Sequence, residues 1–195
     1  MEKGGCADAL TAAGATAGGR VAFADELRLG LHGRVRRVWA PRGVKVRQRV
    51  QLRYQWRWLA LAVDGRGGGL WWAWLPNLRK EAAAPVVEDR GAAGVAALVW
   101  DGAPSHRARL VREAGVPLVA LPPAAPELNP AERVFQELRR AVEGLVHASL
   151  DDKVAAVERE LAALAADPAR LRSLAGWAWI DDALARLPAE NPAPS

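Results

Sequence analysis

Three acidic residues are the first candidates for chemistry in this sequence of 195 residues. Asp25 follows the apolar residues 21–24, and Asp101 follows the apolar residues 98–100. A carboxylate directly after a buried strand is costly to desolvate unless it pairs with a cation or binds a metal ion. Functional sites of open α/β sheets form just beyond the carboxyl ends of strands. Two such aspartates therefore indicate a carboxylate site, although Asp101 followed by Gly102 also suits a turn, and Asp25 could cap an element or pair with a nearby arginine.

Glu132 is the third candidate, and it also has a purely structural explanation. Residues 129–132, Asn-Pro-Ala-Glu, match a helix N-cap, a proline at the first helical position and an acid at the third, which is a capping box. The same position holds the carboxylate at the exposed start of the helix, away from its apolar face. Coordination of a metal would require its oxygens to turn toward the sheet. His106 lies five residues after Asp101, and Asn129 lies three residues before Glu132. Both side chains could therefore contact the ligands of such a site.

The residue types indicate which metal this site would select. Carboxylate oxygens favour Mg²⁺ or Mn²⁺ over zinc. The three histidines, His32, His106 and His147, are scattered, and the single cysteine, Cys6, excludes an internal disulfide framework and a cysteine-based zinc cluster. The sequence contains neither a GxxxxGK[ST] phosphate loop nor a GxSxG serine elbow. These patterns give no support to a P-loop nucleoside triphosphatase or to a serine hydrolase of the elbow type.

A band of nine cations occupies residues 34–57, with no acidic residue among them. The chain has 27 basic residues in all, so the other 18 are outnumbered by its 22 acidic residues. A basic band on a mildly acidic body suggests a polyanion partner such as nucleic acid. The alternative is a solvated strand face whose charges prevent edge aggregation. The predicted DNA-binding residues are Arg34, Arg36, Arg37, Arg42, Lys45, Arg47, Arg49, Arg53 and Arg57.

The elements that must position these residues are expected to form an α/β domain. The periodicity predicts strands at residues 20–24, 35–39, 50–63, 70–75, 96–100 and 117–121. It predicts helices at residues 79–89 (interrupted by Pro85), 104–114, 131–145, 149–166 (capped by Ser149) and 168–187. The glycines after Asp64 predict a hairpin turn. Strands first, followed by alternating strands and helices, argue for a mixed sheet with helices on its faces.

The location of the protein is expected from what the sequence lacks. No apolar run reaches about 18 residues, so no membrane span is expected. Residues 1–19 lack the basic start and the apolar core of a secretory signal. A chain with one cysteine suits a reducing compartment, and the cytoplasm is the simplest expectation.

Four segments, taken in order, resemble the bacterial insertion-sequence transposases of the mariner superfamily. They are residues 23–26 (Phe-Ala-Asp-Glu), 37–43 (Arg-Val-Trp-Ala-Pro-Arg-Gly), 99–106 (Val-Trp-Asp-Gly-Ala-Pro-Ser-His) and 121–133 (Leu-Pro-Pro-Ala-Ala-Pro-Glu-Leu-Asn-Pro-Ala-Glu-Arg). The last two are the most specific, because a DxAPxH segment followed by PPxxPxLNPxE is rarely met by chance. The resemblance covers residues 20–145.

The resemblance implies a ribonuclease-H-like, retroviral-integrase-like fold of class α/β, with a mixed sheet of about five strands flanked by helices. Asp25, Asp101 and Glu132 match the catalytic DDE triad, with Asp25 expected on the central first strand, Asp101 on the neighbouring fourth and Glu132 on a later helix. The implied cofactors are two Mg²⁺ or Mn²⁺ ions, both contacted by Asp25. The expected organisation is a flexible lead-in at 1–19, the DDE catalytic domain at 20–145, C-terminal helices packed on it at 146–187, and a disordered tail at 188–195.

The same resemblance implies DNA strand cleavage and strand transfer at transposon ends. The expected partner is double-stranded DNA, both transposon ends and target, which would place the protein at the nucleoid in the cytoplasm. A separate helix-turn-helix chain is expected to recognise the ends, because no such region precedes residue 20, and a homodimer is expected from the family. The alternatives are an inactive remnant that only binds DNA or a partner, and a ribonuclease-H-like structure-specific nuclease.

Overall fold

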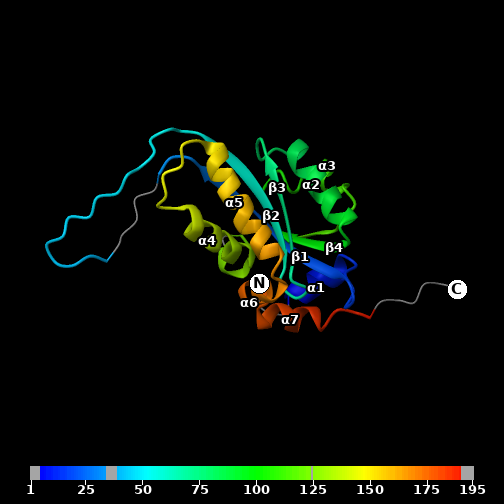
Figure 1. The fold of residues 1–195 in the computed structure, drawn as a ribbon. Helices are drawn as coiled ribbons and strands as arrows, with labels where there is room; N and C mark the ends of the chain where they lie inside the picture. The colour runs from blue at the N-terminus through cyan, green and yellow to red at the C-terminus, as the bar shows by residue number, and fades with distance from the viewer. Residues whose placement is uncertain (1–4, 34–38, 124, 190–195) are drawn as a thin grey trace.

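The computed structural model describes residues 5–33, 39–123 and 125–189. Its centre is a five-stranded sheet in the order β3-β2-β1-β4-β5 (Figure 1). The strands are β1 (Arg20–Gly30), β2 (Trp56–Asp64), β3 (Gly69–Leu75), β4 (Val95–Trp100) and β5 (Leu118–Ala120). The helices are α1 (Gly5–Ala12), α2 (Lys80–Ala92), α3 (Arg109–Arg112), α4 (Ala131–Val142), α5 (Leu150–Ala165), α6 (Pro168–Ala175) and α7 (Ala178–Leu184), with a 3₁₀ turn η1 (Pro126–Leu128) before α4.

The sheet is mixed, as predicted. β1 is antiparallel to β2 and parallel to β4, β2 and β3 form an antiparallel hairpin, and β4 and β5 are parallel. The predicted hairpin turn after Asp64 is confirmed, and one of its glycines is required by packing. A Cβ at Gly65 would lie 2.2 Å from the carbonyl oxygen of Ala175, so only glycine allows this turn to approach the end of α6 so closely.

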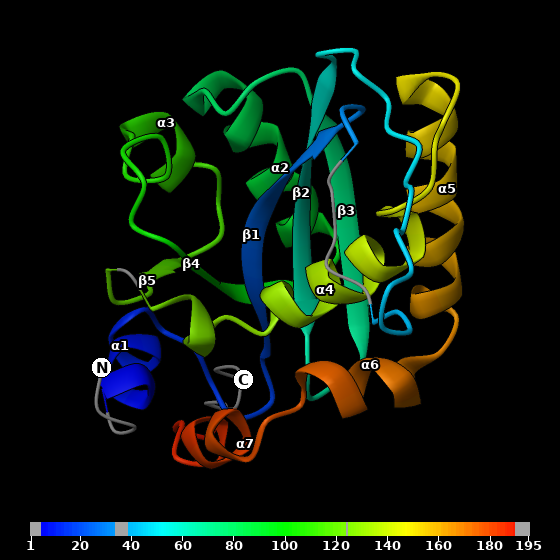
Figure 2. The same ribbon diagram turned by 90° about the vertical axis from the view of Figure 1, so that its left-hand side faces the viewer.

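Helices cover both faces of the sheet (Figure 2). Successive side chains of a strand point to opposite faces, and β1 follows this rule closely. Val21, Phe23, Leu27 and Leu29 belong to a core shared with α1, α4, α5, α6 and α7. Ala22 and Ala24 belong to a second core shared with α2 and α3. The two faces are referred to below as the α4 face and the α2 face.

β1 is longer than predicted. It continues to Gly30, so Asp25 and Glu26 lie within the strand and not at its end. The two acids break the apolar pattern, but pairing with β2 continues through them as far as Gly30 and Trp56. β4, in contrast, pairs only with β1 residues 20–23. Asp25 therefore lies just beyond the part of β1 that pairs with its parallel neighbour β4. In this respect its position matches the predicted one, at the end of a strand.

Other predicted elements have different bounds. The strand predicted from residue 50 begins only at Trp56, and residues 52–55 are exposed. Of the strand predicted at 35–39, residues 35–38 lie outside the described residues and Trp39 is exposed and in no strand. The helix predicted at 104–114 is reduced to Arg109–Arg112, because Ala108 has an extended backbone. α2, in contrast, runs without a break and contains Pro85.

The segment before β1 also differs from its expectation. Within residues 1–19, for which we expect a flexible lead-in, residues Gly5–Ala12 form α1. Leu10 is fully buried in the α4-face core, and the backbone N–H of Ala17 donates to the carbonyl of Pro188. The alanine-rich sequence favours a helix, and its few apolar side chains find a core to pack on. In the part of the chain that the structure describes, no helix is long and apolar enough to cross a membrane.

Candidate active site

Asp25 and Asp101 are brought together by the register of two parallel strands. Phe23 pairs with Val99. Counting two residues onward along each strand leads to Asp25 and Asp101, which therefore leave the paired region side by side. Two residues onward along β1 also keeps the same face, so Asp25 continues the α4 face defined by Phe23, while Asp101 directly follows the last residue of β4. The charge of Asp101 acts on the pKa of Asp25, which agrees with this proximity.

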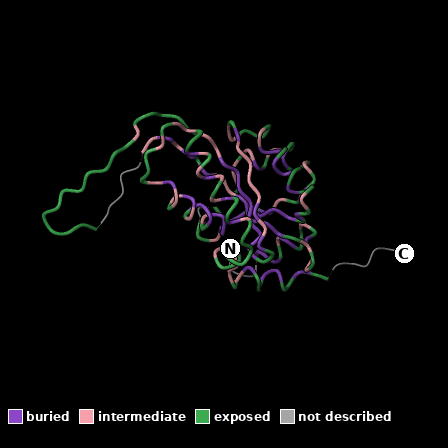
Figure 3. Tube along the Cα trace, in the orientation of Figure 1, coloured by how far each residue is buried: buried purple, intermediate pink, exposed green. Residues whose placement is uncertain are grey.

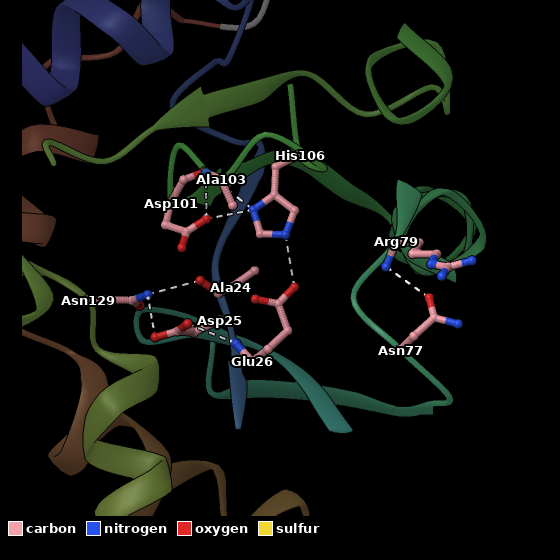
Figure 4. A network of polar contacts seen from close by, with 9 residues as sticks. All are labelled: Ala24, Asp25, Glu26, Asn77, Arg79, Asp101, Ala103, His106 and Asn129. Atoms are coloured by element: carbon pink, nitrogen blue, oxygen red, sulfur yellow. Dashed lines mark hydrogen bonds and ion pairs between the residues drawn. The ribbon is translucent and has the colours of Figure 1, made fainter. Parts of the chain in front are cut away.

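The start of α4 is fixed to β1 by Asn129. Its side-chain amide donates to the carbonyl of Ala24 at 2.9 Å and to Oδ2 of Asp25 at 3.3 Å. Its Oδ1 accepts from the backbone N–H of Ala131 at 3.1 Å, and the side chain is buried. Asn129 thus contacts the first residue of α4 and Asp25 at the same time. It was predicted as a supporting residue, and the structure brings it into direct contact with a candidate carboxylate (Figure 4).

Glu132 lies in the first turn of α4, but it does not form the capping box that was its structural explanation. No side chain caps the N-cap position of α4, Pro130. The carboxylate of Glu132 instead lies 3.5 Å from Nη1 of Arg139, with both side chains about one-third exposed (32%). Its charge raises the pKa of Asp25. Glu132 is therefore within electrostatic reach of Asp25, while its Oε2 contacts Arg139.

His106 and Glu26 complete the cluster. Nδ1 of His106 lies 2.6 Å from Oδ1 of Asp101, and Nε2 lies 3.0 Å from Oε1 of Glu26 (Figure 4). The imidazole also stacks on Trp100, with ring centroids 3.7 Å apart. We did not predict Glu26 as a site residue. The alternation of side chains along a strand could have indicated a separate role for Glu26, because a residue next to Asp25 on β1 must point to the opposite, α2 face.

The cluster shifts the pKa values of two of its members. The pKa of Asp25 is raised to about 7, chiefly by burial and also by the charges of Glu26, Glu132 and Asp101, against the lowering effect of the hydrogen bond from the Glu26 backbone N–H. Burial alone would lower the pKa of His106. The hydrogen bonds and charges of Glu26 and Asp101 outweigh burial, so the pKa of His106 is raised.

The donor set fits a divalent cation in its chemistry. Four carboxylates within electrostatic reach repel one another, and oxygen ligands suit Mg²⁺ or Mn²⁺. Among the described residues, no group of three His, Cys, Asp or Glu side chains is yet arranged to hold an ion. One of the candidate carboxylates, Glu132, contacts Nη1 of Arg139 at 3.5 Å instead.

The described part of the basic band forms a long extension of the chain that projects from the body (Figures 1 and 3). Arg42, Lys45, Arg47 and Arg49 on it are exposed. At its base, Arg57 pairs with Asp151 of α5 at 3.1 Å. The other predicted DNA-binding residue at the base, Arg53, contacts the carbonyl of Ala148 at 3.5 Å. The remaining ones, Arg34, Arg36 and Arg37, lie outside the described residues.

Comparison with known proteins relates this geometry to a family. Residues 20–153 match the family model described as DDE superfamily endonuclease. Among solved structures, the catalytic domain of Mos1 mariner transposase is similar with a TM-score of 0.56 at 14% identity, covering 93% of this chain and 92% of that chain. The Mos1 strand transfer complex is similar with a TM-score of 0.63 at 14% identity, covering 94% of this chain and 59% of that chain.

A third solved structure is the Mos1 transposase paired-end complex with left transposon end. It is similar with a TM-score of 0.57 at 15% identity, covering 88% of this chain and 60% of that chain. The chain thus spans about three fifths of the Mos1 chains in these complexes. No curated protein matched the sequence significantly. At this level of identity the structural likeness concerns the fold, and it confirms the predicted ribonuclease-H-like class.

Proposed function

Because the chain belongs to the DDE superfamily of endonucleases, we propose that it is the catalytic domain of a transposase that cuts DNA strands at transposon ends and joins them to target DNA. The observation that carries the proposal is the register of β1 and β4. It brings Asp25 and Asp101 out of the paired region on neighbouring strands, and the charge of Glu132 on α4 acts on Asp25. The order of the three acids along the chain, two on strands and one on a helix, agrees with the triad that the family resemblance implies and supports the proposal.

The proposed cofactors are two Mg²⁺ or Mn²⁺ ions, held by Asp25, Asp101 and Glu132. Divalent ions in such a pair lower the pKa of an attacking water and stabilise the leaving 3′ oxygen of the phosphodiester. Two solved Mos1 paired-end complexes of the same fold are described as complexes with Mn and with Mg. The raised pKa of Asp25 supports the proposal, since a carboxylate crowded by three other carboxylates is stabilised by a nearby cation.

Each of the three candidate carboxylates would have a separate task in this reaction. Asp25 would lose its proton and help to hold the ions, while the side-chain amide of Asn129 donates to its Oδ2. Asp101 would offer Oδ2, since its Oδ1 accepts from the backbone N–H of Ala103 and contacts His106. Glu132 would leave Arg139 and turn toward the aspartates.

The basic extension is proposed to contact the DNA backbone. Cations on an exposed segment add affinity and salt sensitivity, but they read little sequence. Double-stranded DNA, as transposon end and as target, is then the partner, which would place the protein at the nucleoid in the cytoplasm. A separate helix-turn-helix chain for end recognition and a homodimer complete the proposed assembly.

The experiment is a cleavage assay on a plasmid that carries the DNA flanking the gene on both sides, as the candidate transposon ends. We expect nicked and joined products with Mg²⁺ or Mn²⁺ and none with EDTA. Asp101→Asn should reduce the products to background, because it removes a charged ligand while keeping the shape of the side chain. Asp182→Asn, at an exposed position of α7, is the matched control and should cut like the wild type.

Three outcomes of this assay would count against the proposal. Undiminished cleavage by a folded Asp101→Asn protein would remove Asp101 from the triad. Cleavage that ignores the transposon-end DNA and follows DNA shape would favour a structure-specific nuclease. A folded wild-type chain that binds DNA but never cuts it, with or without an end-recognition chain, would favour an inactive remnant.

A further inference from the structure

We infer that His106 is a positioning residue: it clamps one oxygen of Asp101 and anchors itself on Glu26, so that the second Asp101 oxygen is directed at the divalent cation. This inference rests on the proposed function, because it assigns a task within the same site. It identifies Glu26 as an anchor and not as a fourth ligand.

The exposure of the three side chains shows why Asp101 needs such support. The side chain of Asp101 is 53% exposed, whereas those of His106 and Glu26 are 5% and 7% exposed. Asp101 also follows the last residue of β4, so the sheet does not hold it. A carboxylate in this position can rotate freely unless a neighbour fixes it, and rotation would have to be suppressed on each binding event.

His106 has the properties of a rigid clamp. Its ring lies on Trp100, with centroids 3.7 Å apart and an angle of 18° between the planes. Nδ1 contacts Asp101 at 2.6 Å, and Nε2 contacts Glu26 at 3.0 Å. Both ring nitrogens are thus occupied and one face is covered. The orientation of the imidazole is therefore determined from three sides, and it transmits that orientation to Asp101.

The clamp leaves one oxygen of Asp101 available. In the described part of the chain, the side-chain hydrogen bonds of Asp101 all involve Oδ1, with His106 and with the backbone N–H of Ala103. Figure 4 shows the second oxygen on the side where Asp25 and Asn129 lie. Glu26 points to the α2 face, where His106 occupies its Oε1. The arrangement sorts the carboxylates into metal-facing and anchoring ones.

Mn²⁺ affinity of the full chain, measured by calorimetry without DNA, tests the clamp independently of cleavage. His106→Ala should weaken Mn²⁺ binding by about 10- to 100-fold, the usual effect of removing a group that orients a metal ligand. His106→Asn should recover most of the affinity, because its amide can donate to Asp101 from the place of Nδ1. Both variants remove the imidazole, so recovery in His106→Asn identifies the hydrogen bond that orients Asp101 as the cause.

Two substitutions at Glu26 test its contact with Nε2 of His106. They also keep the inference testable if His106→Ala prevents folding. Glu26→Gln keeps an acceptor oxygen for Nε2 and should bind Mn²⁺ within about threefold of the wild type. Glu26→Leu removes the acceptor and should weaken binding by about tenfold or more. His32→Ala, which removes a histidine that stacks on Tyr54 outside the site, is the control and should leave the affinity unchanged.

The outcomes separate this inference from the proposed function. Unchanged Mn²⁺ affinity in folded His106→Ala, or in Glu26→Leu, would overturn the clamp if Asp101→Asn still loses affinity. Unchanged affinity in Asp101→Asn itself would instead remove the proposed metal site, and the clamp with it. Equal weakening in His106→Ala and His106→Asn would also contradict the clamp, because the hydrogen bond to Asp101 would then have no measurable role.

Discussion

Asp25 combines partial burial with three neighbouring carboxylates, and both raise its pKa, to about 7. The ordinary value, 3.8, applies in the unfolded chain. Because the folded-state value is the higher one, Asp25 stabilises the metal-free fold below about pH 4, and this contribution is lost as the pH rises through about 7. A divalent cation would reverse the situation, since it favours the ionised carboxylate.

Proton release therefore reports on Asp25 directly. Mn²⁺ binding at about pH 6 should release close to one proton from Asp25, and at about pH 8 almost none, because the carboxyl is then already ionised. Calorimetry in two buffers of different ionisation enthalpy measures this number at each pH. Equal proton release at both pH values in the wild type would contradict the assignment.

Among the elements, α5 is the one whose start is most fully explained by its sequence. Ser149 Oγ accepts from the backbone N–H of Asp152 at 3.1 Å, and Oδ2 of Asp152 accepts from the backbone N–H of Ser149 at 3.0 Å. Ser149→Ala should lower the free energy of unfolding by about 1 kcal/mol, as measured by urea denaturation. Ser173→Ala, at an exposed position within α6, should change it little. Equal effects of the two substitutions would show that the cap contributes nothing.

Predictions from sequence succeed for the elements whose local signals agree with their packing. The apolar stripe of α4, the cap of α5 and the glycine turn after Asp64 are all local signals, and all three are confirmed. The end of β1 could not be predicted, because Asp25 and Glu26 interrupt the apolar pattern while pairing with β2 continues past them. Glu26 was missed for a related reason. Its partner, His106, lies 80 residues away in the chain.

At the scale of the whole molecule, four exposed cations, Arg42, Lys45, Arg47 and Arg49, lie on an extension that stands apart from the sheet and its helices (Figure 3). The double substitution Arg47→Glu and Arg49→Glu should weaken binding to duplex DNA and flatten the slope of log affinity against log salt by about 2. Filter binding at several salt concentrations measures both effects. The substitutions Arg159→Glu and Arg172→Glu, at exposed positions of α5 and α6, change the net charge equally and should affect the slope much less. An unaltered slope in the first pair would make the extension a solvated surface only.

The account as a whole depends on whether Asp25, Asp101 and Glu132 enclose divalent cations. Anomalous diffraction from a crystal soaked in Mn²⁺ measures this directly. We predict two manganese peaks about 4 Å apart, with Asp25 contacting both and with Glu132 turned away from Arg139. Manganese bound only by other residues, or no manganese at these three carboxylates, would contradict the proposed active site.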